Sequence, residues 1–225
     1  MDKTLVLDRI EYGYQKNGVY VTVIRNACGA FKKGAIHVVT GRSEAGKNIL
    51  LSLMAGLVRP CGGKVFFDGA DIGGIDRESW RKRHVGLVLQ AYKPVPYLTA
   101  LENAGLQMEM NGMPAPQRNK TAAALLEMAG FSACRYRCKS SRLNASQRQT
   151  VMLARAVGAG TRLLLVEAEG WREDYELEYS LMKLLAQAAN DGACVILTSD
   201  SRGIADMADE VWGMKDGVLL PLKVL

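Results

Sequence analysis

The chain has 225 residues, 48% of them hydrophobic, so it can bury the core of one large domain and is not intrinsically disordered. No apolar run approaches the roughly 18–20 residues that span a bilayer, and the N-terminal MDKTLVLD lacks the apolar segment of a signal peptide. These features predict a cytosolic protein. The net charge of +6 permits contacts with nucleic acid or anionic lipid, but the excess is modest. Five scattered cysteines, an odd number, favour reduced thiols.

The N-terminal residues predict a small antiparallel β part. Residues 4–10 and the alternating, β-branched run 19–28 are typical of strands. Tyr12-Gly13-Tyr14, between them, is interpreted as a turn. Residues 64–69 (KVFFDG) are expected to form a further strand that ends in an Asp-Gly turn.

A phosphate-binding loop is predicted between these strands. Residues 36–39 are an apolar strand, 41–47 a glycine-containing loop and 49–57 an apolar helix. The loop has the P-loop spacing Gly-x4-Gly-Lys, which supplies backbone N–H groups and a cation to a phosphate. The P-loop pattern then requires Ser or Thr, whereas this chain has Asn48.

The middle of the chain is predicted to be mainly helical. A helix over 76–83 precedes a buried strand over 85–90. Thr99 and Glu102 form a capping box, so a helix should begin there and extend to about residue 112. Ala, Leu and Met then recur at helical spacing through 116–159. Residues 91–160 are therefore interpreted as an inserted helical subdomain.

The last third alternates strands and helices. The runs 162–167 and 193–200 have continuously apolar centres, which is typical of strands covered on both faces. A helix is expected over 174–190, and a hairpin around Lys215-Asp216-Gly217 closes the chain. The predicted fold is α/β: one domain over 1–225 with a mostly parallel sheet, an N-terminal antiparallel β part and the helical subdomain.

Five stretches, in this order, resemble the ATP-binding subunits of ABC transporters, and most closely the lipoprotein-release and macrolide-export branch. They are GRSEAGKN (41–48), VGLVLQAYKPVPYLTALENAGLQMEMNG (85–112), RLNASQRQTVMLARAV (142–157), LLLVEAEGWRED (163–174) and VILTSDSRGIADMADEVWGMKDGVL (195–219). Together they cover almost the whole chain, and the resemblance implies a P-loop NTPase-like core.

The resemblance assigns roles to particular residues. In that family an aromatic residue stacks on adenine, the P-loop and its lysine hold the phosphates, and a glutamine senses the metal and the attacking water. The corresponding nucleotide-binding positions here are Tyr14, Gly41, Ser43, Gly46, Lys47, Asn48 and Gln90. For Tyr14, an ordinary loop tyrosine is an equal alternative. Asp174 stands in the loop that faces the partner subunit in that family.

Several catalytic positions depart from the family's pattern. Ala168 stands at the general base, and Ser199 stands at the histidine that contacts the γ-phosphate. Asn48 and Glu167 replace the hydroxyl and the aspartate that bind magnesium, so with Gln90 they are expected to be weak metal ligands. Phosphoryl transfer requires metal, water and charge to be positioned together, so these losses predict little catalysis.

Other departures weaken the nucleotide site. In that family a signature motif closes over the ATP of the partner subunit, and here it reads Asn144, Ala145, Ser146 and Gln147. The Cβ atoms of Ala145 and Ser146 hinder close backbone approach, whereas Asn144 keeps a hydrogen-bond donor and is a good helix cap. Glu44 replaces a glycine of the P-loop. Glu169, at the family's proline position, receives little weight as a substitute base.

The resemblance with these losses predicts a degenerate nucleotide-binding subunit with weak or no ATP hydrolysis. It would be the structural or regulatory half of an ATPase dimer, paired with a different, intact subunit and with membrane-spanning subunits, at the inner face of the membrane. ATP binding is expected to be weak and Mg2+ binding doubtful, and no nucleic acid is expected. The alternatives are an active but divergent transport ATPase, with Glu167 or Glu169 as base, and a free-standing, non-catalytic binding protein.

Overall fold

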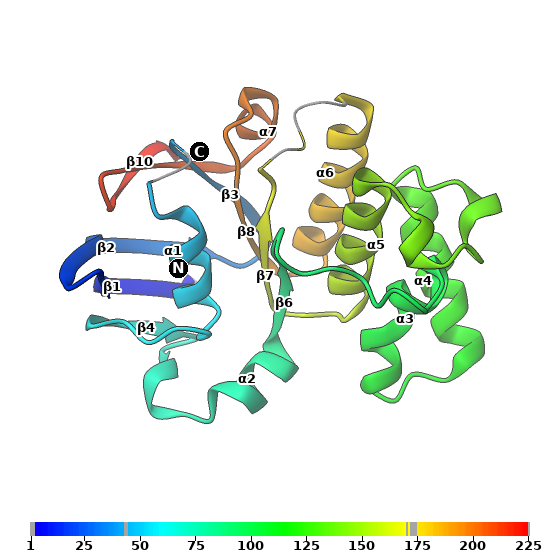
Figure 1. Cartoon of the computed structure of the whole chain (residues 1–225), viewed down its shortest axis with the longest axis horizontal. Helices are drawn as coiled ribbons and strands as arrows, with labels where there is room; N and C mark the ends of the chain where they lie inside the picture. The colour runs from blue at the N-terminus through cyan, green and yellow to red at the C-terminus, as the bar shows by residue number, and fades with distance from the viewer. Residues whose placement is uncertain (1–2, 43–44, 170, 172–174, 225) are drawn as a thin grey trace.

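The computed structural model describes residues 3–42, 45–169, 171 and 175–224 (Figure 1). Ser43, Glu44 and Asp174, for which the sequence predicts roles, lie outside the described residues. The fold has the predicted α/β class: an antiparallel sheet, a mostly parallel sheet and helices on both sides of the latter.

The antiparallel sheet has the strand order β2-β1-β4-β5. Its strands are β1 (Lys3–Lys16), β2 (Val19–Lys32), β4 (Gly62–Phe67) and β5 (Ala70–Asp71). The turn predicted at Tyr12-Gly13-Tyr14 is wrong, because these residues pair with β2 inside a long strand. The chain reverses instead at Asn17-Gly18, where both residues have positive φ, a conformation that Asn and Gly adopt at low cost.

The larger sheet has the order β10-β9-β3-β8-β7-β6. Its strands are β3 (Ala35–Thr40), β6 (Val85–Val88), β7 (Leu163–Glu167), β8 (Cys194–Thr198), β9 (Glu210–Lys215) and β10 (Val218–Val224). All neighbours are parallel except β9 and β10, which form the predicted hairpin around Asp216-Gly217. Strand β6 ends at Val88, two residues before the end that the sequence predicts.

Seven α-helices are found in the described part. They are α1 (Lys47–Met54), α2 (Arg77–His84), α3 (Ala100–Met110), α4 (Ala115–Met128), α5 (Ala145–Gly158), α6 (Tyr175–Asn190) and α7 (Arg202–Asp206), with 3-10 turns at Ile72–Gly74, Ala133–Arg135 and Ser140–Arg142. Helix α1 begins at Lys47, two residues earlier than predicted, and ends at Met54. The predicted capping box of Thr99 and Glu102 begins α3. Helices α3, α4 and α5 lie within the segment 91–160.

Alternate residues of the parallel strands face two hydrophobic cores. Val166 and Leu197 point into a core shared with α5 and α6, whereas Leu165 and Ile196 point into a core shared with α1 and the antiparallel sheet. The larger sheet is therefore covered on both faces, which explains its continuously apolar strands. Figure 1 shows the same layers, with the antiparallel sheet and α1 on the left and α3–α6 on the right. Within the described residues, no helix combines the length and hydropathy that a membrane crossing requires.

Candidate functional site

The predicted site residues gather at one edge of the larger sheet. Strands β3, β8, β7 and β6 are neighbours and parallel, so their carboxyl ends lie side by side. Gly41, Ser199, Ala168 and Gln90 follow these ends. In parallel α/β sheets this edge is where ligands bind.

Two glycines of the P-loop are required by the fold itself. A Cβ on Gly41 would lie 2.2 Å from the carbonyl oxygen of Met214 in β9. Gly46, the N-cap of α1, has φ 91°, a left-handed conformation that L residues rarely adopt, and a Cβ there would lie 2.9 Å from Val23 Cγ1. The sheet and the loop therefore both depend on glycine at these positions, whether or not a phosphate binds.

Lys47 is the most enclosed charge of the site, with 1% of its side chain exposed. Its Nζ donates to the carbonyl oxygens of Gly41 and Arg42, the second at 2.9 Å. It also forms an ion pair with Glu169, in which Nζ lies 2.9 Å from Oε1. The cation that the sequence assigns to phosphate is therefore balanced by a carboxylate of the same chain.

Glu167, at the end of β7, is buried and uses both carboxylate oxygens. Oε1 accepts from Asn48 Nδ2 at 2.8 Å, and Oε2 accepts from the Gln90 backbone N–H at 2.9 Å. Because a carboxylate only accepts, the Asn48 amide must turn its nitrogen, not its oxygen, toward Glu167. A magnesium ion shared by these two residues would need oxygen from both. The observed arrangement of this pair therefore leaves no place for an ion between the two side chains.

The two positions that carry catalytic groups in the resembled family serve the fold here. Ala168 is fully buried in the core beneath α5 and α6, and its N–H donates to the Thr198 carbonyl at 2.9 Å. Ser199 is also fully buried, and its Oγ accepts from the Ser201 N–H at 3.1 Å, at the start of α7. Neither side chain presents a base or a phosphate-binding cation.

The signature positions form the start of α5. Asn144 Oδ1 accepts from the Gln147 N–H at 2.9 Å, and Gln147 Oε1 accepts from the Asn144 N–H at 3.1 Å. This reciprocal capping box stabilises the helix N-terminus. Ser146 lies in its first turn, where its carbonyl accepts from the Thr150 hydroxyl. Tyr14 lies away from this helix, on β1, with 41% of its surface exposed.

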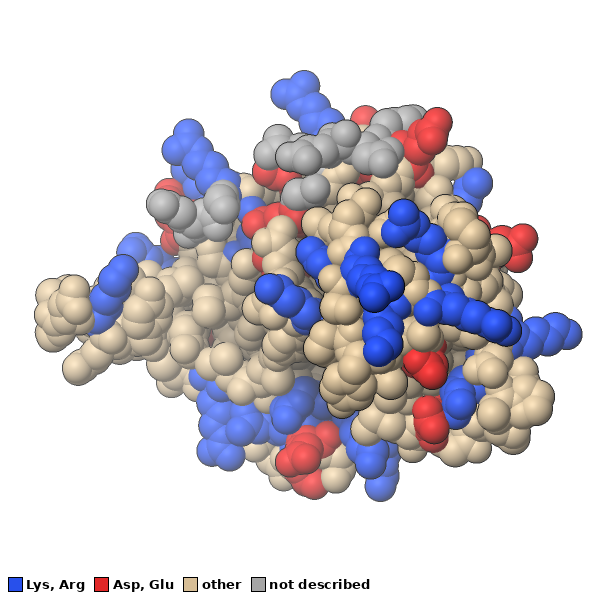
Figure 2. All heavy atoms as spheres, turned by 45° about the vertical axis from the view of Figure 1, so that its right-hand side comes forward, with Lys and Arg blue, Asp and Glu red and all other residues tan. Residues whose placement is uncertain are grey.

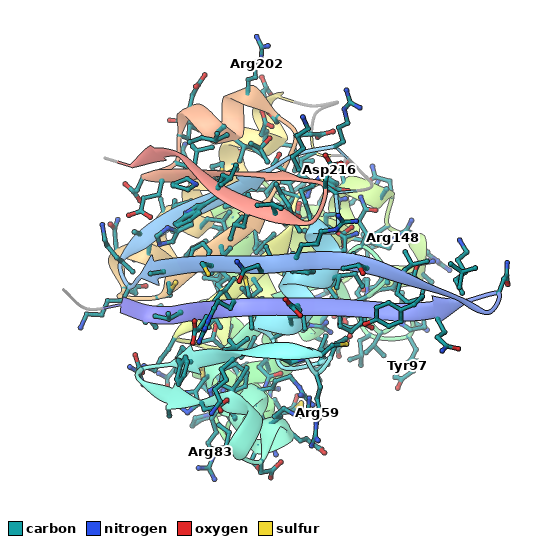
Figure 3. All side chains as sticks on the ribbon, turned by 90° about the vertical axis from the view of Figure 1, so that its left-hand side faces the viewer. Arg59, Arg83, Tyr97, Arg148, Arg202 and Asp216 are labelled. Atoms are coloured by element: carbon teal, nitrogen blue, oxygen red, sulfur yellow. The ribbon has the colours of Figure 1, made fainter. Side chains whose placement is uncertain are left out.

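A groove of about 240 Å³ separates this helix from the ends of the strands. Gln90 and Glu167 line one side and Ala145 and Met152 the other. The positively charged residues Lys93 and Arg148 also line it. Figure 3 places Arg148 and the highly exposed Tyr97 on the side of the molecule toward which the β1–β2 hairpin projects.

The charge of the chain is concentrated in the helical segment. Residues 91–160 contain nine Lys or Arg and three Asp or Glu, which equals the whole net excess of +6. Figure 2 shows several Lys and Arg side chains close together over the helices. This part of the molecule therefore presents a positive field next to the groove.

Comparison with known proteins identifies the family of this fold and site. The family model described as "ABC transporter" matches residues 24–167. The chain belongs to the ABC transporter family, as an ATP-binding domain.

Curated relatives agree with this assignment. The methionine import ATP-binding protein MetN of Cereibacter sphaeroides is 31% identical over 204 residues, which cover 89% of this chain and 58% of MetN. The uncharacterized ABC transporter ATP-binding protein YclH of Bacillus subtilis is 30% identical over 181 residues, 80% of each chain. The macrolide export ATP-binding/permease protein MacB of Brucella melitensis is 30% identical over 92% of this chain, but the match spans only 32% of MacB.

A solved structure has the same fold. The ATP-binding cassette MJ0796, in a dimeric, post-hydrolysis state bound to ADP and Pi, matches with a TM-score of 0.89 and 25% identity. The match covers 98% of this chain and 100% of that chain. The resemblance found in the sequence is therefore confirmed at the level of family and fold.

The structure brings together Lys47, Asn48, Gln90 and Glu167, and it places Ala145 across the groove from Gln90. The functional roles of these residues, and that of Tyr14, stay predictions. Sequence reasoning undervalued Glu169, whose carboxylate reaches the P-loop lysine. The available signal was its position two residues beyond a buried parallel strand, at the ligand-binding edge of the sheet.

Proposed function

We propose that this chain is a degenerate ATP-binding subunit of an ABC transporter, with little or no ATP hydrolysis of its own. It acts as the structural or regulatory half of an ATPase dimer. Its partners are a second, catalytically complete ATP-binding subunit and membrane-spanning subunits at the cytoplasmic face of the membrane. The family assignment supports the transport role, and the chain's own site supports the loss of hydrolysis.

One observation carries the second part: the position of the general base is occupied by a buried residue that has no titratable group. The base position is the buried Ala168. Both oxygens of Glu167 already accept hydrogen bonds, and Glu169 is paired with Lys47. A general base must reach the proton that it removes from water. The same contacts count against the active, divergent ATPase, which needs one of these two glutamates as its base.

Nucleotide binding remains part of the proposal. Gly46 and Lys47 stand at the N-terminus of α1, where backbone N–H groups and a cation favour phosphate oxygens. A bound nucleotide would supply the phosphates that the partner subunit and its signature loop recognise. We expect magnesium to contribute little to this binding, because at position 48 an amide replaces the hydroxyl ligand of the resembled family and its nitrogen is bonded to Glu167.

Docking to a membrane-spanning subunit would use the groove between Gln90 and α5. Lys93 and Arg148 make its rim positive. Tyr97, which is 73% exposed on the same side of the molecule as Arg148, offers an additional aromatic contact. The complementary segment would carry acidic residues, since opposite charges steer and orient protein contacts. This contact would connect Gln90, and through it Glu167 and Glu169, to the membrane subunits.

The test is a phosphate-release assay on the purified chain with ATP and MgCl2. We expect no release above the enzyme-free background. Lys47→Ala serves as the control, because removing this cation abolishes any activity that depends on the P-loop. Steady release that increases with enzyme concentration and is lost in Lys47→Ala would overturn the proposal. Mixing the chain with an intact ATP-binding subunit should give a dimer on size-exclusion chromatography when ATP is present.

A further inference from the structure

The pairing of Lys47 with Glu169 has a consequence for ligand binding. A lysine ammonium with 1% of its side chain exposed is stable only if a nearby negative charge balances it. In a P-loop that balance is available from a nucleotide phosphate. Here Glu169 provides it from within the chain.

The geometry of the pair favours exchange with another anion. Glu169 Oε1 is buried, yet no described residue gives it a well-aligned hydrogen bond, so its contact with Lys47 is mainly ionic. Two donors of the ammonium are used by the Gly41 and Arg42 carbonyls. A phosphate oxygen could supply the same charge and also accept the third N–H, which the carboxylate does not accept well.

Glu169 is held at this place by its backbone as well. Its carbonyl oxygen accepts from Gln90 Nε2. The side chain is therefore positioned beside Lys47 without the need for a ligand, and its effective concentration at the ammonium is that of an intramolecular group.

We propose that Glu169 is an internal anion that occupies the phosphate position at Lys47 and thereby lowers the affinity of the site for nucleoside di- and triphosphates. The proposal rests on the nucleotide site proposed above. Glu169 is a residue that sets affinity, and it takes no part in a reaction. If the pair is formed in about nine-tenths of the molecules, the apparent Kd is about tenfold higher than that of the open site.

The experiment is titration calorimetry of ATP and ADP, with and without MgCl2, into the full chain and two variants. Glu169→Gln removes the charge but keeps the shape, and we expect it to bind ATP about tenfold more tightly. Glu169→Asp keeps the charge on a side chain one methylene shorter, and we expect a smaller gain in the same direction. Glu127→Gln, an exposed glutamate on α4, is the matched control and should bind like the wild type.

Thermal unfolding provides a second readout that also checks folding. Without nucleotide, Glu169→Gln should melt below the wild type, because Lys47 loses its partner. Millimolar ATP should raise the melting temperature of the variant by more than that of the wild type. Unchanged ATP affinity in both Glu169 variants, with both folded, would overturn the inference.

The two proposals fail separately. Phosphate release by the wild type would refute the loss of hydrolysis and leave the affinity comparison intact. Equal binding by the wild type and by Glu169→Gln would refute the role of Glu169 and leave the absence of turnover intact.

Discussion

Replacing Glu167 by Ala tests whether this carboxylate links the P-loop helix to the strand edge. The substitution removes the acceptor of two hydrogen bonds, from Asn48 Nδ2 and from the Gln90 N–H. A hydrogen bond to a charged group contributes about 1.5–3 kcal/mol, but Asn48 and Gln90 are exposed residues that water can reach after the change. Each bond is therefore counted at about 1 kcal/mol, and the expected loss of unfolding free energy is about 2 kcal/mol.

The assay is urea unfolding followed by circular dichroism, for Glu167→Ala, Asn48→Ala and the double variant. With a slope near 3 kcal/mol per molar urea, about 2 kcal/mol lowers the midpoint by about 0.7 M. The double-mutant cycle should give a coupling of about 1 kcal/mol between Asn48 and Glu167. Glu127→Ala, at an exposed position, is the control and should unfold like the wild type. Additive effects of Asn48→Ala and Glu167→Ala, or an unchanged midpoint in Glu167→Ala, would refute the link.

Three further results are expected. Burial lowers the pKa of His37, so the fold keeps this ring neutral, while the unfolded chain protonates it below about pH 6.5. The histidine contribution to the free energy of unfolding should therefore be level above pH 6.5 and fall as the pH drops below it. His37→Gln should reduce this slope and leave a smaller part from His84, whose pKa burial also lowers. Gly41→Ala should cost about 2–3 kcal/mol in urea unfolding, because its Cβ would collide with the β9 backbone, whereas Gly74→Ala, with no atom within 4 Å of its Cβ, should change little. Asn144→Ala should cost about 1 kcal/mol by the same measurement, because it removes the cap of α5, and an unchanged midpoint would contradict that structural role.

Local patterns were sufficient to predict most elements. The capping residues Thr99 and Asn144 begin α3 and α5 as expected, since cap chemistry depends on residues within one helical turn. The apolar runs ending at Glu167 and near Thr198 became buried parallel strands, because a strand covered on both faces carries apolar side chains on both. The error at Tyr12-Gly13-Tyr14 arose because pairing with β2, a tertiary contact, overrode the local turn propensity of Gly13.

That Ala168 cannot act as a base and Ser199 cannot supply a positive charge is evident from the residues themselves, because alanine has no titratable group and serine is uncharged. The directions in which these two side chains point cannot be derived from the residue types. Only the folded chain shows that Ser199 bonds to the start of α7 and that Ala168 belongs to the core.

The family and most of the succession of strands and helices along the chain can be derived from the sequence. Those properties follow from local spacing and from side-chain chemistry. The contacts of the charged residues at the site, in contrast, follow only from the folded chain. Lys47 and Glu169 are 122 positions apart, and only the parallel pairing of β3, β8 and β7 brings the ends of their strands to one edge. Their ion pair balances the P-loop cation from within the chain, and no local pattern contains that contact.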